Sequence, residues 1–284
     1  MGAARILVID GNRAAIREQQ VAAGGSATGE GYVEVLQRLA AVHCDIVRPA
    51  DGEVRFASGS GLTSYDGVAI TGSALNVYDG GAPIERQIEL ARAVFAAGVP
   101  LFGSCWGLQV AVSAAGGRVR RNPKGREFGF ARRIELAAAG RRHPMFRGKP
   151  PVFEAITVHR DDIEQLPPGA VELARNDMGL QAVELRHGPG TCWGVQYHPE
   201  YSFAEIAATA RRYGTALIEE QLFADRAELE AFVTDLRKLM RDPRDRRLTW
   251  KHGLGEALQA QSCQLAELRN WLELQVVPYA RQRH

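Results

Sequence analysis

The chain has 284 residues, 45% of them hydrophobic and 24% charged, with a formal net charge of +2 at pH 7. This length suits one large core, or a domain of about 200 residues with an appendage, and the composition is that of a soluble globular protein. The small net charge favours no particular partner. The scattered arginines lack an aromatic stacking platform, and no run of about 18 apolar residues could span a membrane, so neither nucleic acid nor a membrane is expected as a partner.

The first half of the chain alternates apolar strand-like runs with amphipathic helical segments. Strands are predicted at residues 6–9, 44–47, 68–71 and 99–102, and helices at residues 32–42, 84–97 and 108–115. This alternation predicts an α/β fold, in which helices cover both faces of an open, mainly parallel sheet. We expect the functional site at the carboxyl ends of these strands.

Two connections in this half attract attention. Residues 11–31 are rich in glycine and small side chains, but they lack Gly-Lys-Ser/Thr and match no nucleotide fingerprint. We expect a mobile loop that faces the active site or a partner, because long ordered loops are usually functional. Residues 71–81, which include Asn76 and Tyr78, are expected to help cover a pocket.

A single cysteine lies between glycines in the segment Gly103-Ser-Cys105-Trp-Gly107-Leu-Gln109. A predicted strand precedes Cys105 and a predicted helix follows it, which is the setting of a nucleophile elbow. Gly103 and Gly107 omit side chains that would clash in so sharp a turn, and a helix N-terminus favours a reactive thiolate. Taken alone, a free cysteine is more often a buried apolar residue.

A second motif, Gly194-Val-Gln-Tyr-His198-Pro-Glu200, follows a predicted strand at residues 192–196. His198 could act as a base that Glu200 orients. A lone histidine is more often structural. The two motifs agree in chain order and in secondary-structure setting, however, so together they indicate a Cys-His-Glu triad.

These motifs resemble those of the class I (triad-type) glutamine amidotransferases, and especially the glutaminase domain of GMP synthase and its stand-alone relatives. The resemblance covers roughly residues 4–220 and implies a flavodoxin-like sheet. It implies that Cys105 attacks the side-chain amide of glutamine, that a glutamyl thioester forms and ammonia leaves, and that water then releases glutamate. His198 would be the general base and acid, and Glu200 the carboxylate that orients it.

The resemblance also implies an oxyanion hole. Val68-Ala-Ile-Thr-Gly72-Ser73 resembles the family's oxyanion loop, and the backbone N–H of Trp106 would be the second donor. Donors fixed where charge develops are commonly worth about 3–4 kcal/mol each in a barrier. Without Cys105, the same Thr-Gly-Ser would be an ordinary strand-ending turn.

Four residues are implied to bind the substrate. Gln109 would face its α-amino and α-carboxylate end, and Phe128 lies in the segment 126–131, whose backbone would hold that polar end. Val158 and His159 lie in the stretch 156–161, which resembles the part that closes the glutamine pocket. Here Val158 and Arg160 stand where the family usually has serine and glycine. His159 is either a pocket residue or a surface histidine.

The second half has a different pattern. Short strand-like runs at residues 130–136, 152–158, 171–174, 181–184 and 192–196 predict a β-rich insertion that returns to the sheet just before His198. We therefore expect a class I amidotransferase domain at residues 1–222 and a helical C-terminal extension at residues 223–284.

The extension has two apolar stripes at helical spacing, separated by Pro243, which cannot continue a helix. Either both helices pack back on the domain as core, or they form a docking surface for a second copy or another enzyme. The stripes are Leu229, Phe232, Val233, Leu236, Leu239 and Met240, and then Leu254, Leu258, Leu265, Leu268 and Leu272.

No cofactor or metal is expected, because the four cysteines are isolated, in no CxxC or Cys/His cluster, and no phosphate loop is present. The amino terminus runs directly into a strand, so we expect a cytoplasmic protein with reduced thiols. Three functions stay open. The chain is a glutaminase that supplies ammonia to a separate ATP-dependent synthetase, a free-standing hydrolase of γ-glutamyl amides or peptides, or a non-catalytic binding module. The intact Cys105, His198 and Glu200 argue against the last.

Overall fold

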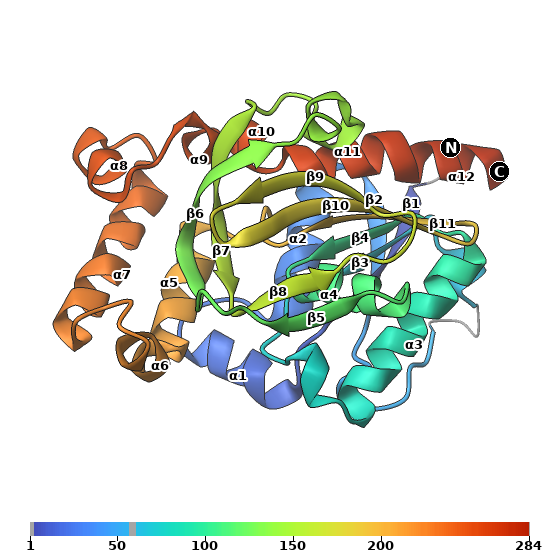
Figure 1. Ribbon diagram of the computed structural model, residues 1–284, viewed down its shortest axis with the longest axis horizontal. Helices are drawn as coiled ribbons and strands as arrows, with labels where there is room; N and C mark the ends of the chain where they lie inside the picture. Colours follow the sequence, from blue (N-terminus) through green and yellow to red (C-terminus); the bar gives the residue numbers. More distant parts are fainter. Residues whose placement is uncertain (1–2, 57–60, 284) are drawn as a thin grey trace.

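The computed structural model describes residues 3–56 and 61–283. Within these residues, a nine-stranded sheet has the order β2-β1-β3-β4-β11-β10-β9-β6-β7, and β5 and β8 form a small second sheet (Figure 1). The strands are β1 (Ala4–Ile9), β2 (Val42–Val47), β3 (Gly67–Ile70), β4 (Leu101–Ser104), β5 (Arg118–Arg121), β6 (Glu127–Leu136), β7 (Val152–His159), β8 (Asp161–Gln165), β9 (Val171–Asn176), β10 (Gly179–His187) and β11 (Gly190–Val195).

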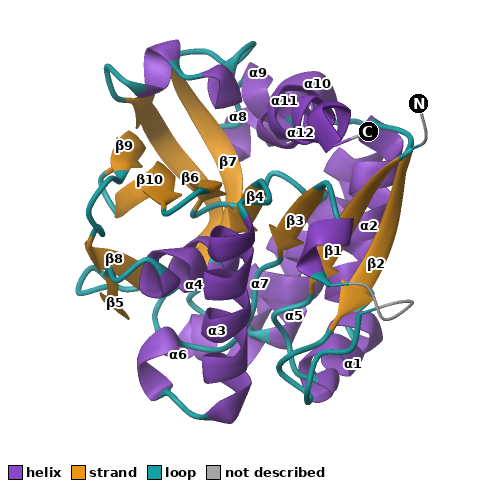
Figure 2. Cartoon of the chain, turned by 90° about the vertical axis from the view of Figure 1, so that its right-hand side faces the viewer, coloured by secondary structure: helices purple, strands orange, loops and turns teal. Residues whose placement is uncertain are grey.

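Helices cover both faces of the large sheet (Figure 2). They are α1 (Ala14–Ala22), α2 (Thr28–Leu39), α3 (Ala82–Ala97), α4 (Trp106–Ala114), α5 (Phe203–Arg212), α6 (Gly214–Glu219), α7 (Arg226–Arg241), α8 (Arg246–His252), α9 (Glu256–Gln259), α10 (Gln261–Gln264), α11 (Ala266–Trp271) and α12 (Val277–Arg283). A π-helical segment, Leu272–Val276, joins α11 to α12.

Side-chain alternation along β1 divides the core into two layers. Ile6 and Val8 pack in the same apolar cluster as Leu36 of α2, whereas Leu7 and Ile9 pack with Val94 of α3. Successive side chains of a strand point to opposite faces, so a fully apolar strand can serve both layers. This arrangement confirms the predicted α/β fold with helices on both faces.

The large sheet changes character at β11. The strands β2, β1, β3, β4 and β11 run parallel to one another, and β10, β9, β6 and β7 continue the sheet with antiparallel pairing that begins between β11 and β10. The predicted β-rich insertion is therefore an extension of the same sheet, and β11 is the strand through which the chain returns to the parallel half. The carboxyl ends of β3, β4 and β11 consequently lie side by side.

The prediction of one long loop at residues 11–31 was wrong. Residues Ala14–Ala22 form α1, and α2 begins at Thr28 rather than at residue 32. Gly24, with φ +95°, ends the first helical segment, whereas Gly29 lies inside α2. A Cβ on Gly29 would lie 3.1 Å from both Asp10 and Ile46, so this glycine permits close packing of α2 on the sheet rather than a flexible loop.

The C-terminal helices pack back on the rest of the chain. Leu229 and Leu236 of α7 are fully buried and share a cluster with Ile206 of α5, while Trp271 and Val276 are buried against the sheet. The apolar stripes are thus largely internal, although Met240 is 50% exposed. The second stripe is not one helix, as its spacing had suggested. It extends from the residue pair before α9, through α9, α10 and α11, to the start of the π-helical segment, and these helices lie along the top of Figure 1.

Candidate active site

Cys105 lies on a sharp turn between β4 and α4. Its backbone has φ 53° and ψ −104°, a conformation that is costly for a non-glycine residue and typical of functional sites. A Cβ on Gly103 would lie 2.5 Å from the backbone of Gly107, and a Cβ on Gly107 would collide with the backbone oxygen of Ile70. The two glycines therefore allow β3, the turn and α4 to approach closely, as the sequence predicted.

The end of β11 brings His198 to this turn. Val195 is paired with Ser104, and the Cys105 N–H donates to the Val195 carbonyl at 2.8 Å. Nδ1 of His198 lies 2.7 Å from Oε1 of Glu200, and the Cys105 side chain is near enough to His198 to help raise the pKa of its imidazole. The structure thus brings the three predicted triad residues together, in the order thiol, imidazole, carboxylate.

The electrostatics of this group favour a proton on His198. Burial opposes the charged imidazole, but the Glu200 charge, the nearby Cys105 side chain and the hydrogen bond with Glu200 outweigh it and raise the pKa of His198 to about 10. An imidazolium beside a thiol can hold the proton that the thiol gives up and can later deliver it to a leaving group. The arrangement is therefore suited to nucleophilic attack by sulfur.

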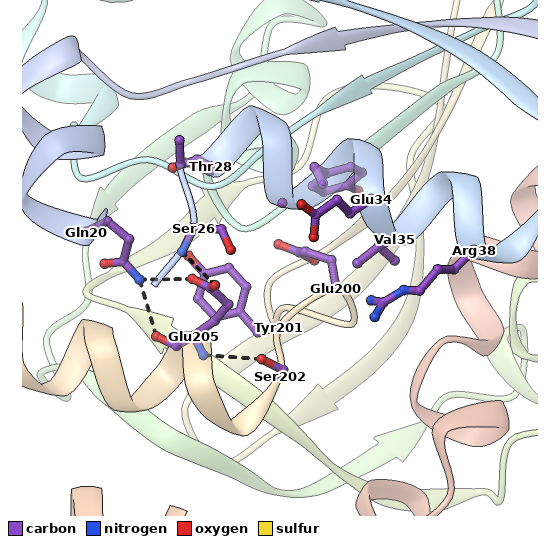
Figure 3. Close-up of a pocket in the computed structure, with 13 residues that line it drawn as sticks. Gln20, Ser26, Thr28, Glu34, Val35, Arg38, Glu200, Tyr201, Ser202 and Glu205 are labelled. Atoms are coloured by element: carbon purple, nitrogen blue, oxygen red, sulfur yellow. Dashed lines mark hydrogen bonds between the residues drawn. The ribbon is translucent and has the colours of Figure 1, made fainter. Parts of the chain in front are cut away.

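Tyr201 is a neighbour of the triad that the sequence analysis missed. Its ring stacks on the His198 ring with a centroid separation of 4.0 Å and an interplanar angle of 20°. Glu200 and Tyr201 also border a cavity of about 120 Å³ whose other walls include α2 and Glu205 (Figure 3). The only sequence signal was an aromatic residue directly after His-Pro-Glu.

The predicted oxyanion residues lie near Cys105 or His198. Gly72 lies against the histidine, since a Cβ there would be 2.5 Å from His198 Cε1. Ser73 lines one cavity with Cys105, and its hydroxyl donates to the Gly11 carbonyl at 2.9 Å, which fixes the loop after β3. Trp106 begins α4 directly after Cys105. Gly72, Ser73 and Trp106 are thus all close to the reacting position.

A cavity of about 130 Å³ opens beside Cys105. Gln109, Val158 and His159, which were expected to bind the substrate, line this cavity. The Val158 carbonyl accepts a hydrogen bond from the Cys105 thiol at 3.5 Å. Residues 71–81 were expected to help cover a pocket, and Leu75 and Asn76 from this segment do line the cavity. The remaining lining residues are Ser73, Ala74, Arg126, Arg160, Asp161 and Tyr213.

Phe128 and His159 direct their side chains to partners inside the protein. The ring of Phe128 packs against Phe223 and Phe232, away from the cavity lining. His159 is buried rather than on the surface, and its Nε2 and Nδ1 atoms lie 2.8 Å from Glu127 Oε2 and 2.9 Å from the Asp161 carbonyl oxygen. His159 therefore shapes the wall, while its ring nitrogens are engaged inside the protein.

Charged residues at the cavity were largely missed. Arg126 makes two hydrogen bonds to Glu220, at 2.7 and 3.1 Å, and Arg160 lies 3.6 Å from the same carboxylate. The hydrogen bond from Arg126 lowers the pKa of Glu220, which keeps this carboxylate ionised. Asp161 accepts a hydrogen bond from the Tyr78 hydroxyl at 2.8 Å. The cavity thus presents both cationic and anionic groups. The one sign of this in the sequence was Arg160, which stands where the family usually has glycine.

In the described part of the chain, no three His, Cys, Asp or Glu residues are grouped so that they could hold a metal ion. No helix among residues 3–56 and 61–283 is long and apolar enough to cross a membrane.

Comparison with known proteins agrees with this geometry. The family model "Glutamine amidotransferase class-I" matches residues 32–210. A gamma-glutamyl-L-1-hydroxyisopropylamide hydrolase from Pseudomonas sp. is 34% identical, over 98% of this chain and 95% of that protein. A glutamine-hydrolysing GMP synthase from Thermomicrobium roseum is 32% identical over 65% of this chain, but the match spans only 32% of the synthase.

The fold has solved counterparts. A glutamine amidotransferase from Thermotoga maritima superposes with a TM-score of 0.61 at 18% identity, covering 97% of this chain and 99% of that one. At this identity the likeness concerns the fold alone. The family match over residues 32–210, together with the relatives that align at above 30% identity, establishes that this chain is an amide-hydrolysing enzyme and a member of the class I glutamine amidotransferase family.

Proposed function

We propose that this chain is a free-standing γ-glutamyl amide hydrolase, in which Cys105, His198 and Glu200 form the catalytic triad. The observation that carries the substrate class is the extent of the similarity. The Pseudomonas hydrolase aligns over 95% of its length, including the C-terminal helices, whereas the GMP synthase aligns over 32%. The chain therefore resembles the hydrolase as a whole protein and the synthase as one part.

The packing of the extension supports the same choice. A glutaminase that supplies ammonia to a synthetase needs a docking surface, and the sequence analysis had offered the C-terminal helices as one possible surface. Leu236, Leu258 and Leu268 are each at most 3% exposed, because these helices cover the chain's own sheet and helices. Residues 223–284 are accordingly proposed as an extension that completes the amidotransferase domain at residues 1–222.

The reaction follows from the geometry. The Cys105 thiolate attacks the γ-carbonyl carbon, and the backbone N–H groups near Gly72, Ser73 and Trp106 stabilise the oxyanion. Collapse of this intermediate forms a γ-glutamyl thioester and breaks the C–N bond, as His198 gives its proton to the departing amine. Water then attacks the thioester and gives a proton to His198, the C–S bond breaks, and glutamate leaves as Cys105 returns to the thiolate beside a protonated His198.

The charges of the cavity suit a γ-glutamyl group. Its α-carboxylate calls for a cation and its α-ammonium for an anion, and Arg160 and Asp161 provide both on one wall. Arg160 is the better candidate to bind the α-carboxylate. Its side chain is 34% exposed, and it lies 3.6 Å from Glu220, which is longer than a hydrogen bond. Arg126 is committed to Glu220 and acts as a support.

The test measures amine and glutamate release by the purified chain alone, with glutamine and a panel of γ-glutamyl alkylamides, including hydroxyalkyl amides. We expect kcat/KM to be highest for an alkylamide and to need no partner. Turnover confined to glutamine, and dependent on an added ATP-using synthetase, would instead identify a glutaminase subunit. Substrates lacking the α-carboxylate should lose most of their rate, and Arg160→Ala should abolish that discrimination.

A further inference from the structure

The loop after β11 carries two of the three triad residues, and its position decides whether they meet Cys105. From the domain side, the His198 N–H donates to the Ile156 carbonyl at 2.8 Å. Within the loop, the Tyr201 N–H donates to the His198 carbonyl at 3.3 Å. Neither bond fixes the backbone at Glu200, whose carboxylate must stay 2.7 Å from His198.

The C-terminal segment supplies that restraint. The side-chain amide of Gln264, at the end of α10, donates to the Pro199 carbonyl at 3.3 Å and to the Tyr201 carbonyl at 2.5 Å. These carbonyls belong to the residues directly before and after Glu200. Both N–H groups of one amide are thus engaged, so a single glutamine restrains the backbone on the two sides of the triad carboxylate.

A second contact reaches the other side of His198. The Tyr197 hydroxyl donates to Oε1 of Glu267 at 2.5 Å, and Lys149 Nζ lies 2.7 Å from the same oxygen. The side chains of Glu267 and Lys149 are 0% and 2% exposed, and Tyr197 is fully buried. Burial and the adjacent Glu267 charge raise the pKa of Tyr197, which keeps the phenol a proton donor. A buried pair with a specific donor fixes geometry well, because breaking it leaves an uncompensated charge.

The loop also borders a cavity. Glu200, Tyr201 and Ser202 border the cavity of about 120 Å³ that is shown in Figure 3, whose remaining walls come from α1, α2, the turn between them and Glu205. Glu200 Oε2 makes no hydrogen bond there. There the loop borders a cavity, so the contacts with Gln264 and Glu267 are direct restraints on the backbone around Glu200 and Tyr197.

We propose that Gln264 and Glu267 are positioning residues, through which the C-terminal segment holds His198 and Glu200 in register with Cys105. The site is then set by the chain itself rather than by a docked partner. This inference rests on the proposed catalytic roles of His198 and Glu200, although not on the choice of substrate.

The test compares Gln264→Ala with Gln259→Ala. Gln259 is a matched control, because it lies five residues away, is also half-buried, and donates to the Leu254 carbonyl at 2.9 Å without touching the triad loop. We expect Gln264→Ala to lower kcat by about 10- to 100-fold with little change in KM, as misplacement of catalytic groups does. Gln259→Ala should retain wild-type kcat, and both variants should melt at similar temperatures.

A substrate-independent readout separates this inference from the proposed activity. The rate of Cys105 alkylation by iodoacetamide is measured against pH for each protein. Loosening of His198 and Glu200 should shift the profile in Gln264→Ala and leave it unchanged in Gln259→Ala, whatever the substrate is. If Gln264→Ala does not fold, Gln264→Met is used instead, because it keeps a side chain of similar length and removes the amide N–H donor. A kcat and an alkylation profile equal to wild type, or changed equally in the control, would overturn the proposal.

Discussion

The two halves of the active site are held in place in different ways. The turn at Cys105 is fixed locally, since Gly103 and Gly107 let neighbouring backbones touch and β3, β4 and α4 leave the turn no room to move. The loop with His198 and Glu200 is fixed from a distance, by Gln264 and Glu267. A site of this kind can lose activity by two routes, one steric and local, the other through a remote hydrogen bond.

The largest effect is expected from removing the nucleophile. Cys105→Ala should abolish amide hydrolysis and leave the fold intact, because no other group can form the thioester. Cys44→Ala is the control, as burial raises the pKa of that thiol to about 11 and keeps it an inactive thiol. Turnover is measured with the best substrate of the panel, and thermal unfolding is measured in parallel. Normal turnover by Cys105→Ala would end the proposed mechanism.

A methyl group at the turn should damage the local half. Gly107→Ala places a Cβ against the Ile70 backbone, and overpacking of this kind typically costs about 1–3 kcal/mol of stability. Separating β3 from α4 also moves the oxyanion donors, so kcat should fall by about 100-fold. Gly52→Ala, where a Cβ meets nothing within 4 Å, should change neither the melting temperature nor kcat. Equal behaviour of the two variants would show that the turn is not sterically fixed.

The charge of Glu200 should be visible in the pH profile. At high pH, activity is lost as the imidazolium gives up its proton, and in the wild type this happens near the His198 pKa of about 10. Glu200→Gln removes the charge that raises this pKa, so the alkaline limb of kcat/KM should move to lower pH. Some activity should remain, since the nucleophile and the base are both present. An alkaline limb at the wild-type pH would show that Glu200 does not tune His198.

The sequence predicted locally determined features better than features that depend on distant contacts. The elbow was predictable because its cause is local: two glycines flank Cys105, and strand and helix patterns meet there. The parallel strands and their order along the chain followed from alternation. His198 and Glu200 were found through a motif and a family resemblance.

Long-range packing could not be predicted in the same way. Gln264 lies more than 60 residues from its partners, and a lone glutamine in a polar helix end carries no signal. The stacking of Tyr201 on His198 depends on how the loop turns, which no local rule specifies. The packing of the Phe128 ring against Phe223 likewise joins residues far apart in the chain, and the substrate role expected for the backbone of this segment stays a prediction. The helix α1 was missed because flanking glycines suggested a loop.

The central claim is that Cys105 is the nucleophile for a γ-glutamyl group, and one measurement tests it most directly. The wild-type chain is exposed to a glutamine-like chloroketone, and the modified residue is identified by mass spectrometry. We predict a single adduct on Cys105, prevented by an excess of a γ-glutamyl amide. No adduct, or an adduct on Cys44, Cys192 or Cys263 instead, would contradict the account.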